Sequence, residues 1–345
     1  MFFCLEKKEL HFKQPAGTSR GVYTTRKIWL AHLSDGESEG IGECAPLPDL
    51  SCDAMSDEAY EEKLNHFCQN LCQTGTIDED ALRDYPSMLF GLETALLDLQ
   101  NKHSLLFDTP FSRGEEGIPI NGLVWMGNHN EMLQRMEEKL EKGFRCVKLK
   151  IGAIDFDQEL DLIKRIRNRF SFHEVELRLD ANGAFKYEEA LYKLELLSQY
   201  NIHSIEQPIK QGQWAYMAEL CRESPLPIAL DEELIGVNDP EMKRHMLNII
   251  KPRFIILKPS LHGGMLGCRE WIQIANDMGI GSWITSALES NIGLNAIAQF
   301  ASDVYGPHIT MPQGLGTGQL FTDNIPMPLT IRGDQLFLDK RTKVT

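Results

Sequence analysis

The sequence predicts an α/β protein in which a (β/α) barrel carries the active site and a smaller α+β domain precedes it. Residues 1 to about 50 alternate short apolar runs with turns, residues 57–101 have helical spacing, and from residue 118 short apolar strands alternate with amphipathic helices. The length of 345 residues fits one barrel of about 250 residues plus a smaller domain. We expect residues 1–110 to form the smaller domain and residues 111–319 the barrel.

The composition argues against several kinds of partner. A net charge of −15 opposes binding to nucleic acid or to an anionic membrane, because both require a basic surface. No stretch approaches the ~18 apolar residues of a membrane span. The eight cysteines include no C-x-x-C pair, and the N-terminus lacks the apolar run of a signal peptide, so we expect reduced thiols in the cytoplasm. The oligomeric state is left open, and a homo-oligomer is compatible with the sequence.

The N-terminal part is expected to form an antiparallel meander followed by helices. Apolar runs occur at Leu10–Phe12, Val22–Thr24 and Ile28–His32, separated by turn-rich stretches. Helical spacing is clearest in Met88–Leu99. Strands followed by helices are typical of a separate α+β domain.

The remainder of the chain repeats the pattern of a strand, a loop, a helix and the next strand. Eight segments are strand candidates: Ile118–Val124, Arg145–Ile151, Val175–Asp180, Ile202–Glu206, Ile228–Asp231, Phe254–Lys258, Gly281–Thr285 and His308–Met311. Helices are expected between them, for example Glu131–Lys142, which precedes Gly143. An open doubly wound sheet usually carries a Gly-rich loop after its first strand, and Val124–Asn128 is no such loop, which favours a barrel.

Two lysines alternate with apolar residues on the second barrel strand. Side chains two apart share a face of a strand, so Lys148 and Lys150 lie on one face and Val147 and Leu149 on the other. On a half-exposed sheet the lysines would simply face water. In a barrel the outer face is covered by helices, so the lysines must face the interior. Their proximity and partial desolvation are expected to lower a lysine pKa and permit acid–base catalysis.

The next three strands each end on a carboxylate. Asp180, Glu206 and Asp231 are separated by 26 and 25 residues, one βα unit each. The carboxyl ends of barrel strands meet at the face where barrel enzymes keep their active sites. One acidic residue after a strand is usually a helix cap, but three in register predict a site for a hard divalent cation. Ligands that are all oxygen favour Mg²⁺ over zinc, with Mn²⁺ as a substitute.

The sixth strand ends on Lys258, across the predicted barrel mouth from Lys150. A substrate carboxylate held at the metal would then have an ammonium group on each side. This arrangement suits removal of the proton α to a carboxylate, because the cation stabilises the negative charge that develops. The expected partner is therefore a small carboxylate substrate.

As an ordered set, these motifs resemble the muconate-lactonising branch of the enolase superfamily and, within it, the members that form o-succinylbenzoate. The resemblance spans nearly the whole chain and rests on seven segments: Lys148–Lys150, Leu179–Gly183, Ile205–Pro208, Leu230–Glu232, Leu257–Ser260, Gly42–Pro48 and Ser286–Ser290. It implies the enolase type of modified TIM barrel, with residues 1–110 as an N-terminal α+β capping domain that residues 320–345 complete. A lysine base beside a divalent cation is the established device of that superfamily.

The resemblance also implies roles for the matched residues. Lys150 would transfer the proton, Lys148 would tune it, and Asp180, Glu206 and Asp231 would hold Mg²⁺. Lys150 would take the ring proton of 2-succinyl-6-hydroxy-2,4-cyclohexadiene-1-carboxylate and return it to the departing hydroxyl. Lys258 would stay cationic and stabilise the intermediate. The product would be o-succinylbenzoate, on the route to menaquinone.

Two loops of the cap would close over the barrel mouth in this family. Here they correspond to the segment near Gln14–Val22, which contains Arg20, and to the turn Pro46–Ser51. Arg20 could attract an anionic substrate, although an exposed arginine on a loop is an equally good interpretation. Ser286 and the turn Gly263-Gly264 are candidates for the substrate's carboxylate tail, by position alone.

Other reactions use the same residues. Racemases and epimerases would use Lys150 and Lys258 from opposite faces. Dipeptide epimerases resemble one another in an Asp-x-Asp after the eighth strand, which Met311–Gly318 lacks. N-succinylamino acid racemase and muconate cycloisomerase remain alternatives. A barrel that only binds a partner would be expected to have lost a ligand or a lysine, and none is lost.

Overall fold

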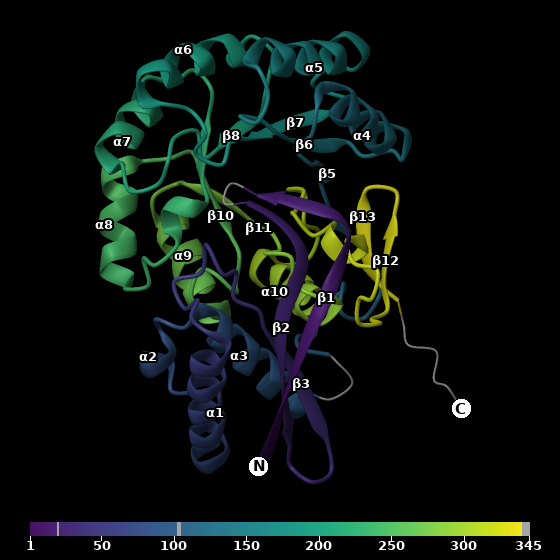
Figure 1. Ribbon diagram of the computed structural model, residues 1–345, viewed down its shortest axis with the longest axis vertical. Helices are drawn as coiled ribbons and strands as arrows, with labels where there is room; N and C mark the ends of the chain where they lie inside the picture. The colour runs from purple at the N-terminus through teal and green to yellow at the C-terminus, as the bar shows by residue number, and fades with distance from the viewer. Residues whose placement is uncertain (19–20, 102–104, 340–345) are drawn as a thin grey trace.

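The computed structural model describes residues 1–18, 21–101 and 105–339, which begin with an N-terminal unit of strands and helices (Figure 1). Its antiparallel sheet has the order β1-β2-β3, with bounds Phe2–Thr18, Gly21–Ser34 and Glu39–Cys44. Its helices are α1 (Asp57–Thr74), α2 (Glu79–Leu82) and α3 (Pro86–Asn101). An antiparallel meander followed by helices is present, as predicted, but the predicted runs Val22–Thr24 and Ile28–His32 belong to one strand, β2.

Helix α3 packs unusually close to strand β3, because glycines remove side chains from the contact. A Cβ atom on Gly42 would lie 1.8 Å from the carbonyl oxygen of Gly91. A Cβ atom on Gly91 would lie 2.2 Å from the Sγ atom of Cys44. The two elements therefore meet backbone to backbone, and the sheet and helices enclose their own hydrophobic core.

The second sheet contains parallel strands in the order β11-β10-β9-β8-β7-β6-β5. Their bounds are Gly122–Val124 (β5), Cys146–Lys150 (β6), Glu176–Asp180 (β7), Ser204–Glu206 (β8), Ile228–Leu230 (β9), Phe254–Leu257 (β10) and Gly281–Ile284 (β11). Strands β6 to β11 confirm six of the predicted strands. The first prediction, Ile118–Val124, is divided into β4 (Ile118–Pro119) and β5.

The eighth predicted strand, His308–Met311, is wrong. These residues form no strand, and the sheet closes instead through isolated parallel bridges from Gln313 to Ile120 and from Gly314 to Thr285. His308 has a φ of 65°, in the left-handed region, and the segment is flanked by two prolines without N–H donors. An apolar pattern alone could not supply the hydrogen bonds that a strand needs.

Helices cover the outer side of the barrel, and in Figure 1 α4 to α8 follow one another in an arc around the strands. Their bounds are His129–Glu141 (α4), Phe156–Arg169 (α5), Tyr187–Ser198 (α6), Trp214–Glu223 (α7), Pro240–Ile250 (α8), Gly264–Asp277 (α9) and Asn291–Tyr305 (α10). The predicted helix at residues 131–142 is α4, which starts with a capping box between Asn128 and Glu131. Val147 and Leu149 lie in the core between strands and helices. In the described part of the chain, no helix has the length and apolarity to cross a membrane.

The C-terminal segment contacts both parts of the chain. Leu320 accepts a hydrogen bond from Lys13 N at 2.8 Å, and Phe321 forms a bridge with Phe12 of β1. The hairpin of β12 (Leu329–Arg332) and β13 (Gln335–Leu338) then pairs with β4.

Two carboxylates of the N-terminal unit cap helices of the barrel. Glu93 of α3 accepts hydrogen bonds from Met265 N at 2.6 Å and Leu266 N at 2.8 Å, at the start of α9. Glu43 of β3 accepts from Ser290 N at 2.8 Å and Gly293 N at 2.9 Å, at the start of α10. Negative charge is favourable at a helix N-terminus, so these contacts fix the unit against the barrel.

Replacing Gly42 with alanine should destabilise the protein, because the new methyl group collides with the backbone of α3. We expect a loss of about 1–3 kcal/mol in the free energy of unfolding by urea. Gly75→Asn is the matched control, since nothing lies within 4 Å of Gly75 and asparagine is tolerated after a helix. Equal stability of Gly42→Ala and the control would contradict the close packing of α3 and β3.

Candidate active site

Charged side chains from neighbouring strands enter one cavity at the carboxyl end of the parallel sheet. Lys148 and Lys150 of β6, Asp180 of β7 and Glu206 of β8 line a cavity of about 730 Å³. Lys258, directly after β10, lines the same cavity. Asp231 follows β9 and is fully buried against Lys258. The structure therefore brings the predicted lysines and carboxylates together.

The β6 lysines form ion pairs with the first two carboxylates. Lys148 Nζ lies 2.8 Å from Glu206 Oε2 and 3.4 Å from Asp180 Oδ2. Lys150 Nζ lies 3.1 Å from Asp180 Oδ2 and stands 5.7 Å from the centre of the Trp125 ring. The lysines thus face the barrel interior, as their alternation with apolar residues predicts.

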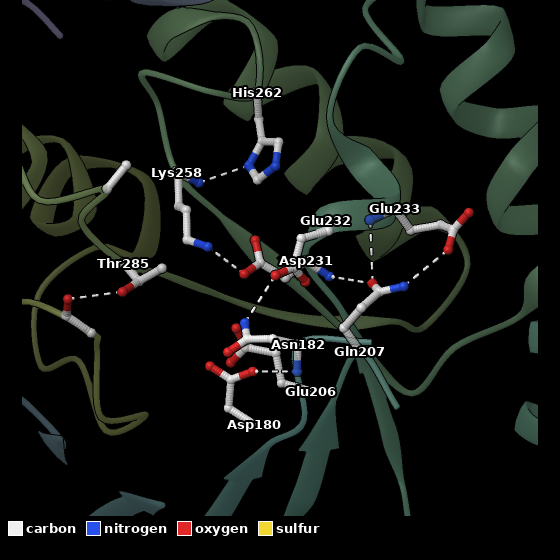
Figure 2. Close-up of polar contacts among 12 residues, drawn as sticks. Asp180, Asn182, Glu206, Gln207, Asp231, Glu232, Glu233, Lys258, His262 and Thr285 are labelled. Carbon is white, nitrogen blue, oxygen red and sulfur yellow. Dashed lines mark hydrogen bonds and ion pairs between the residues drawn. The ribbon is translucent and has the colours of Figure 1, made fainter. Parts of the chain in front are cut away.

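Lys258 approaches the carboxylates from the other side. Figure 2 shows its side chain directed at Asp231, with Glu206 and Asp180 farther along the group. The backbone N–H of Lys258 donates to His262 Nδ1 at 2.8 Å. Lys258 and Lys150 stand on strands four places apart in the order β10-β9-β8-β7-β6, which in a barrel puts them across its mouth.

Two amides that the sequence analysis did not identify organise the site. Asn182 accepts a hydrogen bond from Lys150 Nζ at 2.6 Å. It also donates to Glu232 Oε1 at 2.9 Å, as Figure 2 shows. Gln207 accepts from the N–H groups of Asp231 and Glu233 at 3.3 and 3.2 Å. Both amides follow a carboxylate-bearing strand and have positive φ values of 44° and 42°. Their positions directly after these strand ends in the sequence could have marked them as site residues. Their contacts, however, depend on the backbone conformation, which the sequence does not show.

The predicted lowering of a lysine pKa is wrong for Lys148. Burial lowers the pKa of Lys148, but the negative charges of Glu206 and Asp180 outweigh it and raise the pKa above its usual range. Burial also opposes the charge of Lys258, yet Asp231 and other carboxylates raise its pKa to about 12. Burial and the neighbouring Asp180 raise the pKa of Glu206 to about 8. The attraction of each lysine to the carboxylates thus exceeds the repulsion between lysines, on which the predicted lowering of the pKa was based.

The donor atoms suit a hard divalent cation. Buried oxygens of Glu206 (Oε1), Asp231 (Oδ1) and Glu232 (Oε2) have no hydrogen-bond partner. Unsatisfied buried carboxylate oxygens are unfavourable, and Mg²⁺ binds oxygen ligands of this kind. Among residues 1–18, 21–101 and 105–339, however, no three His, Cys, Asp or Glu side chains stand in a ready ligating arrangement. Lysine ammonium groups lie between the carboxylates instead. The carboxylate oxygens are therefore suitable ligands for a cation, but in this structure they are not spaced to bind one together.

Of the residues predicted from sequence to contact the substrate, only some lie at the cavity. Ser286 lines the cavity. Gly263 and Gly264 are not among the described residues that line it, and they form the start of α9, next to the N–H groups that Glu93 caps. The structure does not bring this turn to the site, because the helix N-terminus is already bound. Arg20 lies outside the described residues.

The N-terminal unit completes the cavity wall. Gln14 of β1 and the residues Leu47 and Leu50 of the turn after β3 line the cavity together with barrel residues Ala287 and Leu288. Leu47 and Ala287 also belong to one small hydrophobic cluster. The part of the wall formed by these residues is therefore largely apolar and is shared between the two parts of the chain.

A parallel barrel whose strand ends gather three carboxylates and three lysines is the frame of an acid–base enzyme. Residues 131–332 match the family model described as enolase C-terminal domain-like, and residues 18–99 match the model described as MenC, N-terminal domain. Together these matches cover both the barrel and the N-terminal unit.

Individual proteins give a finer comparison. The chain is 46% identical to an o-succinylbenzoate synthase of Desulfotalea psychrophila strain LSv54, over 96% of this chain and 97% of that protein. The crystal structure of MenC from the same strain superposes with a TM-score of 0.81 at 41% identity, covering 97% and 99% of the two chains. A dipeptide epimerase from Enterococcus faecalis V583, solved with Mg and the dipeptide L-Leu-L-Tyr, shares the fold with a TM-score of 0.81 at 19% identity, over 98% and 96%. The chain belongs to the o-succinylbenzoate synthase family of the enolase superfamily.

Gln207→Ala should destabilise the protein, because it leaves the buried N–H groups of Asp231 and Glu233 without acceptors. Each unsatisfied group costs about 1–3 kcal/mol, which urea unfolding would measure. The exposed Gln199, changed to alanine, is the matched control. A stability loss no larger than that of the control would show that Gln207 does not hold these strand ends.

Proposed function

We propose that this chain is a metal-dependent hydro-lyase that converts 2-succinyl-6-hydroxy-2,4-cyclohexadiene-1-carboxylate to o-succinylbenzoate and water, in the biosynthesis of menaquinone. The 46% identical relative over nearly the full length supports the choice of substrate. The reaction removes the ring proton α to the carboxylate and expels the hydroxyl from the adjacent carbon. The ring becomes aromatic, which makes the overall step favourable.

One observation carries the proposal. Lysines on opposite sides of the barrel mouth approach the same cluster of carboxylates, with Lys148 and Lys150 at Asp180 and Glu206, and Lys258 at Asp231. A hydrolytic metal site activates a water molecule and does not require a lysine on each side of the metal. Abstraction of a proton from carbon does, because one group must accept the proton while positive charge stabilises the carbanion that forms.

Lys150 is the base and then the acid in this scheme. Its neutral amine takes the α-proton, and the electron pair of the broken C–H bond moves onto the substrate carboxylate. The resulting ammonium group gives the proton to the hydroxyl as the C–O bond breaks, so that water leaves. The Asn182 amide, 2.6 Å from Nζ, fixes the direction of the Lys150 side chain.

Lys148 and Lys258 act as fixed charges. Lys148 donates to Glu206 and lies close to Asp180, so it tunes the field at Lys150 without reaching the ring itself. The carboxylate neighbours of Lys258 raise its pKa despite burial, which favours its protonated form. A permanent cation stabilises the developing negative charge from the second face of the substrate.

Asp180, Glu206 and Asp231 are the proposed ligands of Mg²⁺, with Mn²⁺ as a substitute. When bound, the cation stabilises the negative charge that develops on the substrate carboxylate. The unpaired buried oxygens of Glu206 and Asp231 support this assignment. The related epimerase crystallised with Mg provides further support.

We also propose that residues 1–110 cap the barrel of residues 111–319 and that residues 320–345 complete the cap. The cavity lining by Gln14, Leu47 and Leu50 supports a capping role. Leu320 and Phe321 contact β1, which supports the assignment of the C-terminal residues to the cap. The hairpin of β12 and β13 pairs instead with β4, which precedes the first barrel strand. Ser286 is the proposed contact for a substrate carboxylate, because its hydroxyl lies on the cavity wall.

Lys150→Ala should abolish dehydration while Mg²⁺ binding persists, because the base is removed and the three carboxylates remain. We expect kcat to fall at least about 10³-fold. The rate of product formation is measured from the ultraviolet absorbance of o-succinylbenzoate. Calorimetry should still detect Mg²⁺ binding, with an affinity no weaker than that of the wild type, because the variant loses an ammonium group that competes with the cation for Asp180.

The contrasting variant is Glu206→Gln, which should lose Mg²⁺ affinity. Lys164→Ala, at an exposed position of α5, is the matched surface control and should behave as the wild type. Near-wild-type turnover by Lys150→Ala would show that another group is the base.

Deuterium incorporation would separate the synthase from a racemase. In D₂O we expect dehydration of the cyclohexadiene substrate to exceed α-proton exchange and racemisation of N-succinylamino acids, because the apolar wall and the leaving hydroxyl commit the enzyme to elimination. Both rates are measured on the same preparation, by absorbance and by proton NMR. Exchange and racemisation that outpace dehydration would make racemisation the principal activity and overturn the proposal.

A further inference from the structure

A buried arginine of the N-terminal unit joins this unit to the barrel loop that shapes the cavity. Arg26 lies on β2 and is almost completely buried. Its guanidinium donates to the carbonyl oxygens of Ala45 at 2.5 Å and of Pro46, at the start of the turn after β3. It also donates to the carbonyl oxygens of Leu288 at 3.3 Å and Ala287 at 3.4 Å. One side chain therefore binds the backbones of both cavity-lining segments.

The barrel segment that Arg26 binds is strained. Leu288 has a φ of 67°, a left-handed conformation that residues with a side chain rarely adopt. Such a conformation persists only where surrounding contacts impose it. Here the Leu288 carbonyl accepts from Arg26 Nε, and its N–H donates to Ser286 Oγ at 3.0 Å. The hydrogen bonds on both sides of the residue hold the unfavourable conformation.

Two buried carboxylates complete the support of this loop. Glu289 accepts from Ala287 N at 2.7 Å and from Ser260 Oγ at 2.5 Å, two residues beyond Lys258. Glu43 accepts from Ser290 N at 2.8 Å and from the Ser290 hydroxyl. The buried guanidinium has Glu43 and Glu289 as its nearby counter-charges. Residues 286–290 are thus held between the N-terminal unit and the segment that carries Lys258.

We infer that Arg26 is a positioning residue that sets substrate specificity by holding Leu288 in its left-handed conformation and the turn 45–51 against it. This inference rests on the proposed function, because the wall in question is that of the substrate cavity. Leu47, Leu50, Ala287 and Leu288 form this wall, and Arg26 binds backbone on both of its sides. Arginine is required because a lysine cannot reach four carbonyl groups with one fixed fork of donors.

The test measures kinetics and loop exchange in Arg26→Lys and Arg26→Gln. We expect KM for the cyclohexadiene substrate to rise about tenfold in Arg26→Lys while kcat changes by less than about threefold, because binding and not proton transfer is affected. Amide hydrogen exchange in peptides covering residues 286–290 should accelerate about tenfold. Arg26→Gln, which is uncharged and has fewer donors, should show both effects more strongly and serves as the second variant if Arg26→Lys does not fold.

A double-mutant cycle with Leu288→Gly tests whether Arg26 acts on substrate binding through Leu288. Glycine adopts positive φ readily, and the variant lacks the side chain that Arg26 is inferred to position. In this background Arg26→Lys should raise KM by less than about twofold. Arg178→Lys is the matched control, since Arg178 is also buried and donates to the carbonyl of Pro312 inside the barrel. It should lower the melting temperature without changing KM.

The outcomes separate this inference from the proposed function. Wild-type KM together with wild-type exchange in residues 286–290 overturns the role of Arg26. A full tenfold rise in KM in the Leu288→Gly background also overturns it, because Arg26 would then act elsewhere. A wild-type enzyme that does not dehydrate the substrate overturns the proposed function alone, and the exchange measurement still decides whether Arg26 holds the loop.

Discussion

Mutual repulsion among Asp180, Glu206 and Asp231 is the constraint on which the active site depends. Parallel neighbouring strands bring their carboxyl ends together, so the fold itself concentrates negative charge in a buried place. Burying like charges is unfavourable unless opposite charges or a metal compensate them. The lysines compensate in the structure, and the divalent cation proposed for this site would compete with them for the same oxygens. Metal binding and lysine protonation are therefore linked.

The sequence was sufficient for the parts of the molecule that repeat. Strands β6 to β11 were predictable because buried parallel strands are short apolar runs at regular intervals, and because the last residue of several runs is charged. The inward direction of Lys148 and Lys150 followed from the period of two once a barrel was assumed. Their alternation would have meant only a solvated face on an antiparallel sheet. The direction of these side chains could therefore be predicted only after the fold class had been assigned.

Other features depended on three-dimensional contacts that no spacing reveals. The barrel closes at Gln313 and Gly314, although the apolar run lies before them, because the backbone at His308 cannot continue a strand. The pKa of Lys148 depends on how many carboxylates surround it, and the sequence gave only its distance from Lys150 along the strand. The supporting amide Gln207 owes its role to a positive φ. Each of these is set by partners remote in the chain.

The structure separates the groups that we propose for proton transfer from those that we propose for substrate selection. The lysines and carboxylates stand on or directly after strands, where backbone hydrogen bonds hold them, and the same set can serve elimination or racemisation. The apolar wall consists of loops from two parts of the chain, and their positions depend on contacts such as those of Glu43 and Glu93 with barrel helices. A substitution between the two units can therefore alter which substrate is accepted without touching a catalytic group. With the proposed function, specificity would follow from how the N-terminal unit is docked as much as from the residues that touch the substrate.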